Sequence, residues 1–97
     1  MYFYNLESLE KFAKDKIRVW LLSVNLTDPA SMKPYDVAEE KILTEFDINN
    51  KKIRQLKYIA YNNKNSVINE YTSEDSRWDY ITPDSIYDSM IKYFKEN

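Results

Sequence analysis

The middle of the chain repeats one pattern, a run of strand-forming residues followed by a short polar turn, and no other feature limits the fold as much. Residues 53–61 read IRQLKYIAY and residues 67–72 read VINEYT, and both runs are rich in β-branched and aromatic residues, which favour strands. The turns at 49–51 and 62–65 contain Asn and Lys. Because the chain has no glycine, we expect Asn to occupy the left-handed backbone positions that tight turns need. Residues 40–72 are therefore predicted to form strand, turn, strand, turn, strand.

The first strand of this meander is less clearly defined by its sequence. Residues 36–48 fit both a helical and a strand period, since Ile42 and Phe46 fall on the apolar face in either case. We favour a strand from about Glu40, because the two strands that follow are suitable partners for it.

Shorter elements are expected before the meander. Residues 2–4 are a candidate for a short aromatic strand. Asn5 is a good N-cap residue, and the residues after it predict a short N-terminal helix. The apolar side of that helix would consist of Leu6, Leu9 and Phe12. Residues 17–26 (IRVWLLSVNL) are apolar on both faces near their middle, which predicts a central strand with Trp20 in the core.

The chain ends in a predicted amphipathic helix. Thr82 and Pro83 are residue types preferred at the N-cap and at the first helical position. The apolar stripe of the helix would consist of Ile86, Met90, Ile91 and Phe94. Packing of this stripe on the sheet stabilises the helix, and we expect Trp78 to close one end of the core. The predicted fold class is α+β: a single domain, 1–97, in which an antiparallel β-sheet (meander) is packed by a C-terminal α-helix.

Missing residue types exclude most catalytic chemistry. The chain has no Cys and no His, which removes the thiol nucleophile, thiolate metal ligands and the commonest general base. Without glycine there is no glycine-rich phosphate loop. Ser85 has no ordinary base to activate it, so we interpret it as part of the helix start. Carboxylate pairs can hydrolyse glycosides, but the chain is unusually short for that chemistry. We expect no catalytic residues, no cofactor and no metal.

Charge is divided unevenly along the chain, although the formal net charge is only −2. Residues 51–69 contain basic residues and no acid, whereas residues 70–88 contain six acids and one arginine. The acidic segment matches no calcium-loop spacing and is interpreted as a solvated surface. The basic segment supplies the candidate residues for binding an anion or a partner, namely Lys51, Lys52, Arg54, Lys57, Lys64, Tyr58 and Tyr61. Nucleic acid is not expected as the partner, because proteins that bind it are usually strongly basic.

Several short motifs follow one another along almost the whole chain. They are YNLESL (4–9), IRVW (17–20), EFD (45–47) with KKIR (51–54), YNNKN (61–65) and, most specifically, WDYITPDS (78–85). In this order and spacing the chain resembles the surface-adhesin protein E family of bacterial extracytoplasmic domains. The resemblance implies an antiparallel sheet packed by the C-terminal helix. It also implies a non-enzymatic domain of exported proteins, whose named member binds host matrix and serum proteins.

One family feature is absent from this chain. The resemblance implies one Cys after the aromatic–acid pair and another near the C-terminus, and the matching positions are Ile48 and about Lys95. A bridge closing so long a loop would contribute about 4 kcal/mol, so this chain must rely on packing instead. The resemblance implies a periplasmic or cell-surface location, with a signal peptide outside this chain. The location would be cytoplasmic if Met1 is the native start.

A function from a second class stays open at this point. A small intracellular inhibitor or immunity-type protein could block a partner enzyme through the acidic segment 70–88, because charge complementarity speeds and orients docking. The expected partner is a protein in both cases, a host matrix or serum protein in the first. The sequence contains no membrane-spanning run. The oligomeric state is left open, although an edge strand at 2–4 could pair between chains.

Overall fold

Seven strands form one antiparallel sheet in this computed structural model, which describes residues 2–4, 8–73 and 77–96. The strands are β1 (Tyr2–Tyr4), β2 (Glu10–Ala13), β3 (Lys16–Val24), β4 (Glu39–Asp47), β5 (Lys52–Tyr61), β6 (Val67–Thr72) and β7 (Asp79–Tyr80). A 3₁₀ turn, η2 (Pro29–Ser31), lies in the loop between β3 and β4, and one α-helix, α1 (Ile86–Glu96), ends the described part of the chain.

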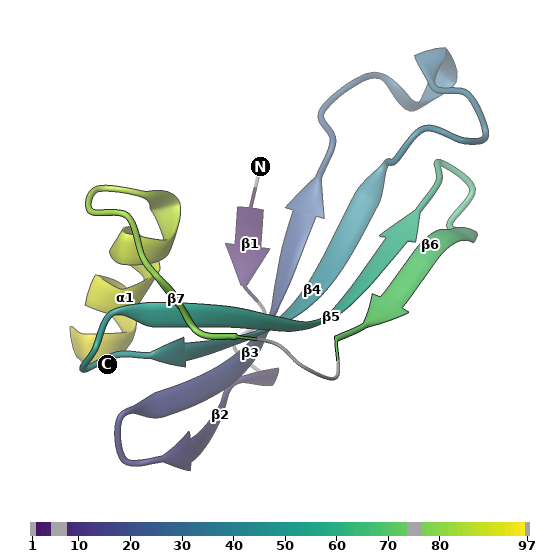
Figure 1. Ribbon diagram of the computed structural model, residues 1–97. Helices are drawn as coiled ribbons and strands as arrows, with labels where there is room; N and C mark the ends of the chain where they lie inside the picture. The colour runs from purple at the N-terminus through teal and green to yellow at the C-terminus, as the bar shows by residue number, and fades with distance from the viewer. Residues whose placement is uncertain (1, 5–7, 74–76, 97) are drawn as a thin grey trace.

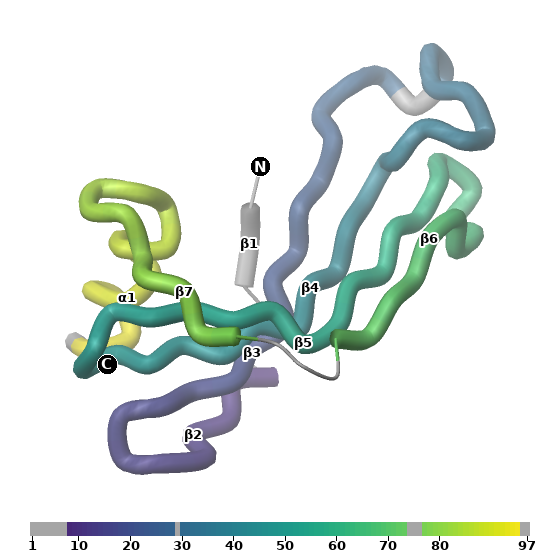
Figure 2. The backbone as a smooth tube through the Cα atoms, in the orientation of Figure 1, coloured from purple at the N-terminus to yellow at the C-terminus, as the bar shows by residue number. Residues whose placement is uncertain are grey.

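Three long strands, β3, β4 and β5, run through the whole sheet, and short strands flank them in pairs. The main order is β1-β3-β4-β5-β6, while β2 pairs with the first half of β3 and β7 with the first two residues of β5. The sheet therefore has two halves. Helix α1 covers the half that contains β2 and β7, and the half that contains β6 extends away from the helix (Figure 1). The tube in Figure 2 shows the same separation along the backbone.

The predicted meander is confirmed, and so are the sheet and the C-terminal helix. β4, β5 and β6 follow one another as antiparallel neighbours. The turn before β6 uses Asn65 at a φ of 64°, as expected for Asn, whereas the turn before β5 uses Lys51 at a φ of 52°. That first turn is held instead by the Asp47 carboxylate, which accepts hydrogen bonds from the Asn50 amide nitrogen (3.1 Å) and side chain (3.0 Å).

The prediction of a short N-terminal helix is wrong for the residues that can be described. Phe12 lies in strand β2, which pairs with β3 through a tight turn. Glu10 lies opposite Arg18 in this pairing, and their side chains form an ion pair at 3.7 Å. Cross-strand pairing thus overrides a weak local helical preference. Asn5 and Leu6 lie outside the described residues.

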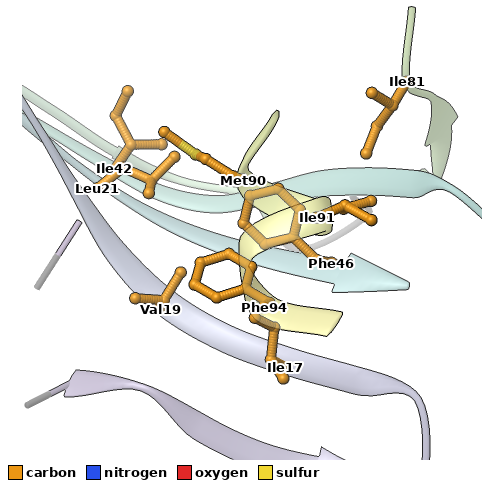
Figure 3. Close-up of a cluster of buried hydrophobic side chains, with 9 residues drawn as sticks. All are labelled: Ile17, Val19, Leu21, Ile42, Phe46, Ile81, Met90, Ile91 and Phe94. Carbon is orange, nitrogen blue, oxygen red and sulfur yellow. The ribbon is translucent and has the colours of Figure 1, made fainter. Parts of the chain in front are cut away.

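The core lies between α1 and one face of the sheet (Figure 3). Phe46 on β4 is completely buried, and its ring lies 5.5 Å from the ring of Phe94 on α1. The other buried apolar residues of this cluster are Ile17, Val19, Leu21, Ile42, Ile81, Met90 and Ile91. Ile81 lies between β7 and α1, and the others come from alternate positions of β3 and β4 and from the helix. One face of the sheet is therefore apolar where the helix covers it.

A β-bulge at Leu56 changes which side chains of β5 reach this core. Strict alternation predicts that Ile53 and Tyr58 point to opposite faces. The pairing with β4 skips Leu56, because Leu43 faces Lys57 while the next residue, Thr44, faces Gln55. With one extra residue in the strand, Ile53 and Tyr58 both pack against the core.

Helix α1 begins later than its sequence predicts. The prediction of Thr82 as N-cap and Pro83 as the first helical residue is wrong, because the helix starts at Ile86. The cap is Ser85, whose Oγ accepts a hydrogen bond from the Asp88 amide at 3.3 Å. Met90, Ile91 and Phe94 are buried as predicted, but Ile86 is exposed and Tyr87 packs against the core in its place.

Candidate binding surface

The face of the sheet that points away from α1 is called the open face below. Its side chains follow from the register of the three long strands. They include Lys16, Arg18, Trp20 and Leu22 of β3, Glu39, Lys41, Leu43, Glu45 and Asp47 of β4, and Lys52, Arg54, Lys57, Ile59 and Tyr61 of β5. On the half of the sheet whose other face is covered by α1, the open face is charged. On the half that extends away from the helix, it is largely apolar.

A buried carboxylate organises the charged half. Glu45 is 0% exposed and lies between Arg18 and Arg54 in directly paired positions of β3, β4 and β5. Its Oε2 accepts hydrogen bonds from Arg18 Nε (3.0 Å) and Nη2 (2.7 Å), and its Oε1 accepts one from Arg54 Nε (2.6 Å). Both carboxylate oxygens are therefore satisfied, as a buried charge requires.

Each arginine of this triad also lies on an aromatic ring. The guanidinium of Arg18 is 5.0 Å from the centre of the Phe12 ring, and that of Arg54 is 4.4 Å from the Trp78 ring. The prediction that Trp78 closes one end of the sheet–helix core is wrong, because Trp78 covers Arg54 on the open face. Cation–π contacts of this kind are worth about 0.5–2 kcal/mol each. They hold both guanidinium groups in place.

A second charged row lies beside the first. Asp47 lies between Lys16 and Lys52 in the register, with Lys16 Nζ 4.0 Å from its Oδ2. Burial alone would raise the pKa of Asp47, but the hydrogen bonds from Asn50 and the two lysine charges outweigh it and lower that pKa. Lys52 Nζ also lies 4.7 Å from the centre of the Tyr80 ring. The second row thus has the same order as the first row, a cation, an anion, a second cation and an aromatic ring.

The apolar half of the open face forms a recess, called the aromatic recess below. It has a volume of about 560 Å³, and its open-face lining consists of Trp20, Leu22, Glu39, Lys41, Ile59 and Tyr61. Lys41 Nζ is 5.2 Å from the centre of the Tyr61 ring. The prediction of Trp20 as a core residue is wrong, since its side chain is half-buried and points away from the helix. Residues 17–26 are apolar on both faces near their middle, and this pattern indicates two different apolar surfaces.

The structure does not gather the sequence-predicted binding residues into one patch. Lys51 and Lys64 lie in the turns at opposite ends of β5, which spans about 33 Å at the usual rise of a strand. Tyr58 faces the helix side and stacks on Tyr71 at 5.5 Å, whereas Tyr61 lines the aromatic recess.

The remaining candidates already have partners within the chain. Arg54 binds Glu45, and Lys52 lies over the Tyr80 ring. Lys57 forms an ion pair with Glu70 at 3.2 Å. A binding role for the seven candidates stays a prediction.

The described part of the chain also bears on metal binding and on membrane insertion. No group of three or more Asp, Glu, His or Cys side chains that could hold a metal ion occurs there. No helix in the same residues combines the length and the apolar character needed to cross a bilayer.

Comparison with known proteins gives one match. The sequence model of the family described as surface-adhesin protein E matches residues 1–94 of the 97. No curated protein sequence and no solved structure matches the chain.

Proposed function

This chain belongs to the surface-adhesin protein E family, and from that premise we propose that it is a non-enzymatic, adhesin-like binding domain that contacts a protein partner through the aromatic recess. Membership suggests an exported or surface protein. The proposal adds to the family match the surface that makes the contact and the absence of catalysis.

The aromatic recess is the observation that carries the proposal. Tyr and Trp are enriched at protein interfaces, because each ring covers much area and also offers a polar atom. Trp20 and Tyr61 are both half-buried here, which leaves part of each ring for a partner. Lys41 and Glu39 put one charge of each sign at the rim. An apolar centre with a polar rim is the usual anatomy of a protein-binding site.

The charged half of the open face supports this choice of surface. Arg18 and Arg54 form ion pairs with Glu45 and lie on aromatic rings, so both guanidinium groups are already engaged in contacts within the chain. The proposed contact therefore rests on burial of apolar area, with the charges of the rim setting orientation.

The inhibitor alternative has no support in the family match. Its proposed acidic surface is also divided in the structure. Glu70 pairs with Lys57, and Asp88 is buried at the start of α1, where it accepts a hydrogen bond from the Asp84 amide at 2.9 Å.

Binding to immobilised fibronectin, laminin, collagen and serum albumin tests the proposal. The chain contains similar pairs of a lysine over a tyrosine ring at separate places, which allows matched variants. Lys41→Ala with Tyr61→Ala removes the pair at the aromatic recess. We expect this double variant to weaken binding at least about tenfold, since central interface residues each contribute more than about 1 kcal/mol.

Two control variants make the result specific. Lys33→Ala with Tyr35→Ala removes the pair in the β3–β4 loop and should leave binding unchanged. Lys52→Ala with Tyr80→Ala tests the basic segment directly. The proposal fails if the loop variant weakens binding as much as the recess variant, or if no protein of the panel binds above a scrambled-sequence control.

A further inference from the structure

A second recess lies on the helix side of the molecule, at the end of the sheet where β2 turns into β3. It is called the end recess below, and it has a volume of about 560 Å³. Its floor is apolar and includes Leu9, Ile48 and Phe94, which all belong to or pack against the core. The last turn of α1 forms one wall, and the β2–β3 turn forms the other. Cavities of this size hold small ligands in other proteins.

The rim of the end recess is positively charged. Lys11 on β2, Lys14 in the β2–β3 turn and Lys95 in the last turn of α1 all line it, and all three are exposed. None of the three forms an ion pair with another described residue. Three lysines around one recess are notable in a chain whose net charge is −2.

One acid lines the same recess and must be counted against these lysines. Asp15 lies in the β2–β3 turn, and its backbone carbonyl accepts a hydrogen bond from the Ile48 amide at 2.8 Å. The C-terminal end of α1 adds a partial negative charge, which Lys95 offsets from its position in the last turn. Among the residues that line the recess, the three lysines therefore outnumber the one acid.

We propose that the end recess binds a small amphiphilic anion, an apolar body ending in a carboxylate, as in a medium-chain fatty acid. The apolar body lies on Leu9, Ile48 and Phe94, where it removes apolar area from water. The carboxylate lies among the three lysines, which supply ammonium donors without an acidic partner of their own. An inorganic anion would leave the apolar floor exposed, and a cationic amphiphile would meet like charge.

This site is separate from the proposed protein contact. The end recess opens beside α1 and the β2–β3 turn, whereas the aromatic recess lies on the opposite face of the sheet. Neither recess shares a lining residue with the other. Loss of binding at one site therefore says nothing against the other.

Titration of the ¹⁵N-labelled chain with decanoate, below its micelle concentration, tests the proposal. We expect amide shifts centred on Ile48, Tyr93 and Lys95, and weaker binding at high salt. Decyltrimethylammonium has the same apolar body with the opposite charge and should produce no saturable shift at these residues. The double variant Lys11→Gln with Lys14→Gln should raise the decanoate Kd roughly tenfold, the loss expected for two partly screened charges.

The matched control removes the same charge elsewhere. Lys33→Gln with Lys64→Gln changes two exposed lysines in the β3–β4 loop and the β5–β6 turn, at the opposite end of the sheet from the β2–β3 turn (Figure 1). This variant should leave the Kd within about twofold of the parent, because the two lysines lie beyond the screening length. Unfolding midpoints of both double variants show whether the fold is kept. The proposal is overturned if decanoate and decyltrimethylammonium bind alike, if the control variant weakens decanoate as much, or if the shifts centre on the aromatic recess.

Discussion

A carboxylate that is fully removed from water must be compensated where it lies, and Glu45 meets this condition through Arg18 and Arg54. Strand register places the three side chains opposite one another, so no long side chain has to be bent into position. The rings of Phe12 and Trp78 then cover the two guanidinium groups. At the scale of single residues, strand register and ring contacts thus position the side chains of the charged half of the open face.

Removal of one arginine should cost more than removal of the whole triad. Arg54→Met leaves Glu45 buried with one partner, and we expect a loss of about 3 kcal/mol in the free energy of unfolding, the low end for a broken buried pair. The triple variant Arg18→Met, Glu45→Leu and Arg54→Met should lie within about 1 kcal/mol of the parent, because no charge remains buried. Urea unfolding measures both. Equal losses in the single and triple variants would show that packing, and not charge, explains the effect.

Two aspartates should make the protein less stable in acid. The Asp84 amide, followed by the charges of Lys92 and Lys51, holds the pKa of Asp88 below its usual value, and the pKa of Asp47 is also lowered. An unfolded aspartate titrates near about 3.9, so below that pH the unfolded chain binds more protons than the folded one. The free energy of unfolding should therefore fall as pH drops from about 4 toward the lowered folded values. Asp88→Asn should show a smaller fall than the parent, and an identical pH profile would contradict this assignment.

At the scale of elements, the start of α1 shows how local signals compete. Thr82-Pro83 is a good start sequence, yet Ser85 is the residue that caps the helix. Asp84 adopts a φ of 62°, which ends the preceding turn and prevents a helix from running through it. Asp88 then accepts a hydrogen bond from the amide of Asp84, one residue before the cap, whereas in a capping box this bond comes from the cap residue itself.

A pair of alanine substitutions distinguishes the two helix starts. Ser85→Ala should cost about 1 kcal/mol, the usual loss for an N-cap hydroxyl. Thr82→Ala should change stability by less than about 0.5 kcal/mol, as for an exposed residue without such a role. Thermal or urea unfolding of both variants is sufficient. A larger loss for Thr82→Ala than for Ser85→Ala would mean that the helix begins where the sequence alone predicts.

Most strands could be predicted because their residues leave few alternatives. Most of residues 67–72 (VINEYT) are β-branched or aromatic, and strand β6 has the same bounds in the structure. The bulge at Leu56 could not be predicted, because an extra residue in a strand changes no local preference and shows only in the pairing. Strand β2 was missed for a similar reason, since its EKFA sequence has no strong β preference and depends on its neighbour β3.

At the scale of the whole molecule, one helix is too short to cover a sheet built on strands of nine or ten residues. The helix therefore protects one half of one face, and the other half extends from it (Figure 1). The sequence identifies residues 17–26 as apolar on both faces near their middle, but it cannot show that only one of these faces is covered by a helix. The aromatic recess is the part of the second face that remains for a partner.

Both tryptophans of the chain lie on the open face, which gives the central claim a direct reporter. The measurement is ¹⁹F NMR of the chain labelled with 5-fluorotryptophan, with the two resonances assigned through Trp78→Phe. When a protein of the matrix and serum panel binds, the Trp20 resonance should shift more than that of Trp78, since Trp20 lines the proposed contact and Trp78 is held on Arg54. Saturable binding that leaves the Trp20 resonance in place would contradict the assignment of the aromatic recess as the binding surface.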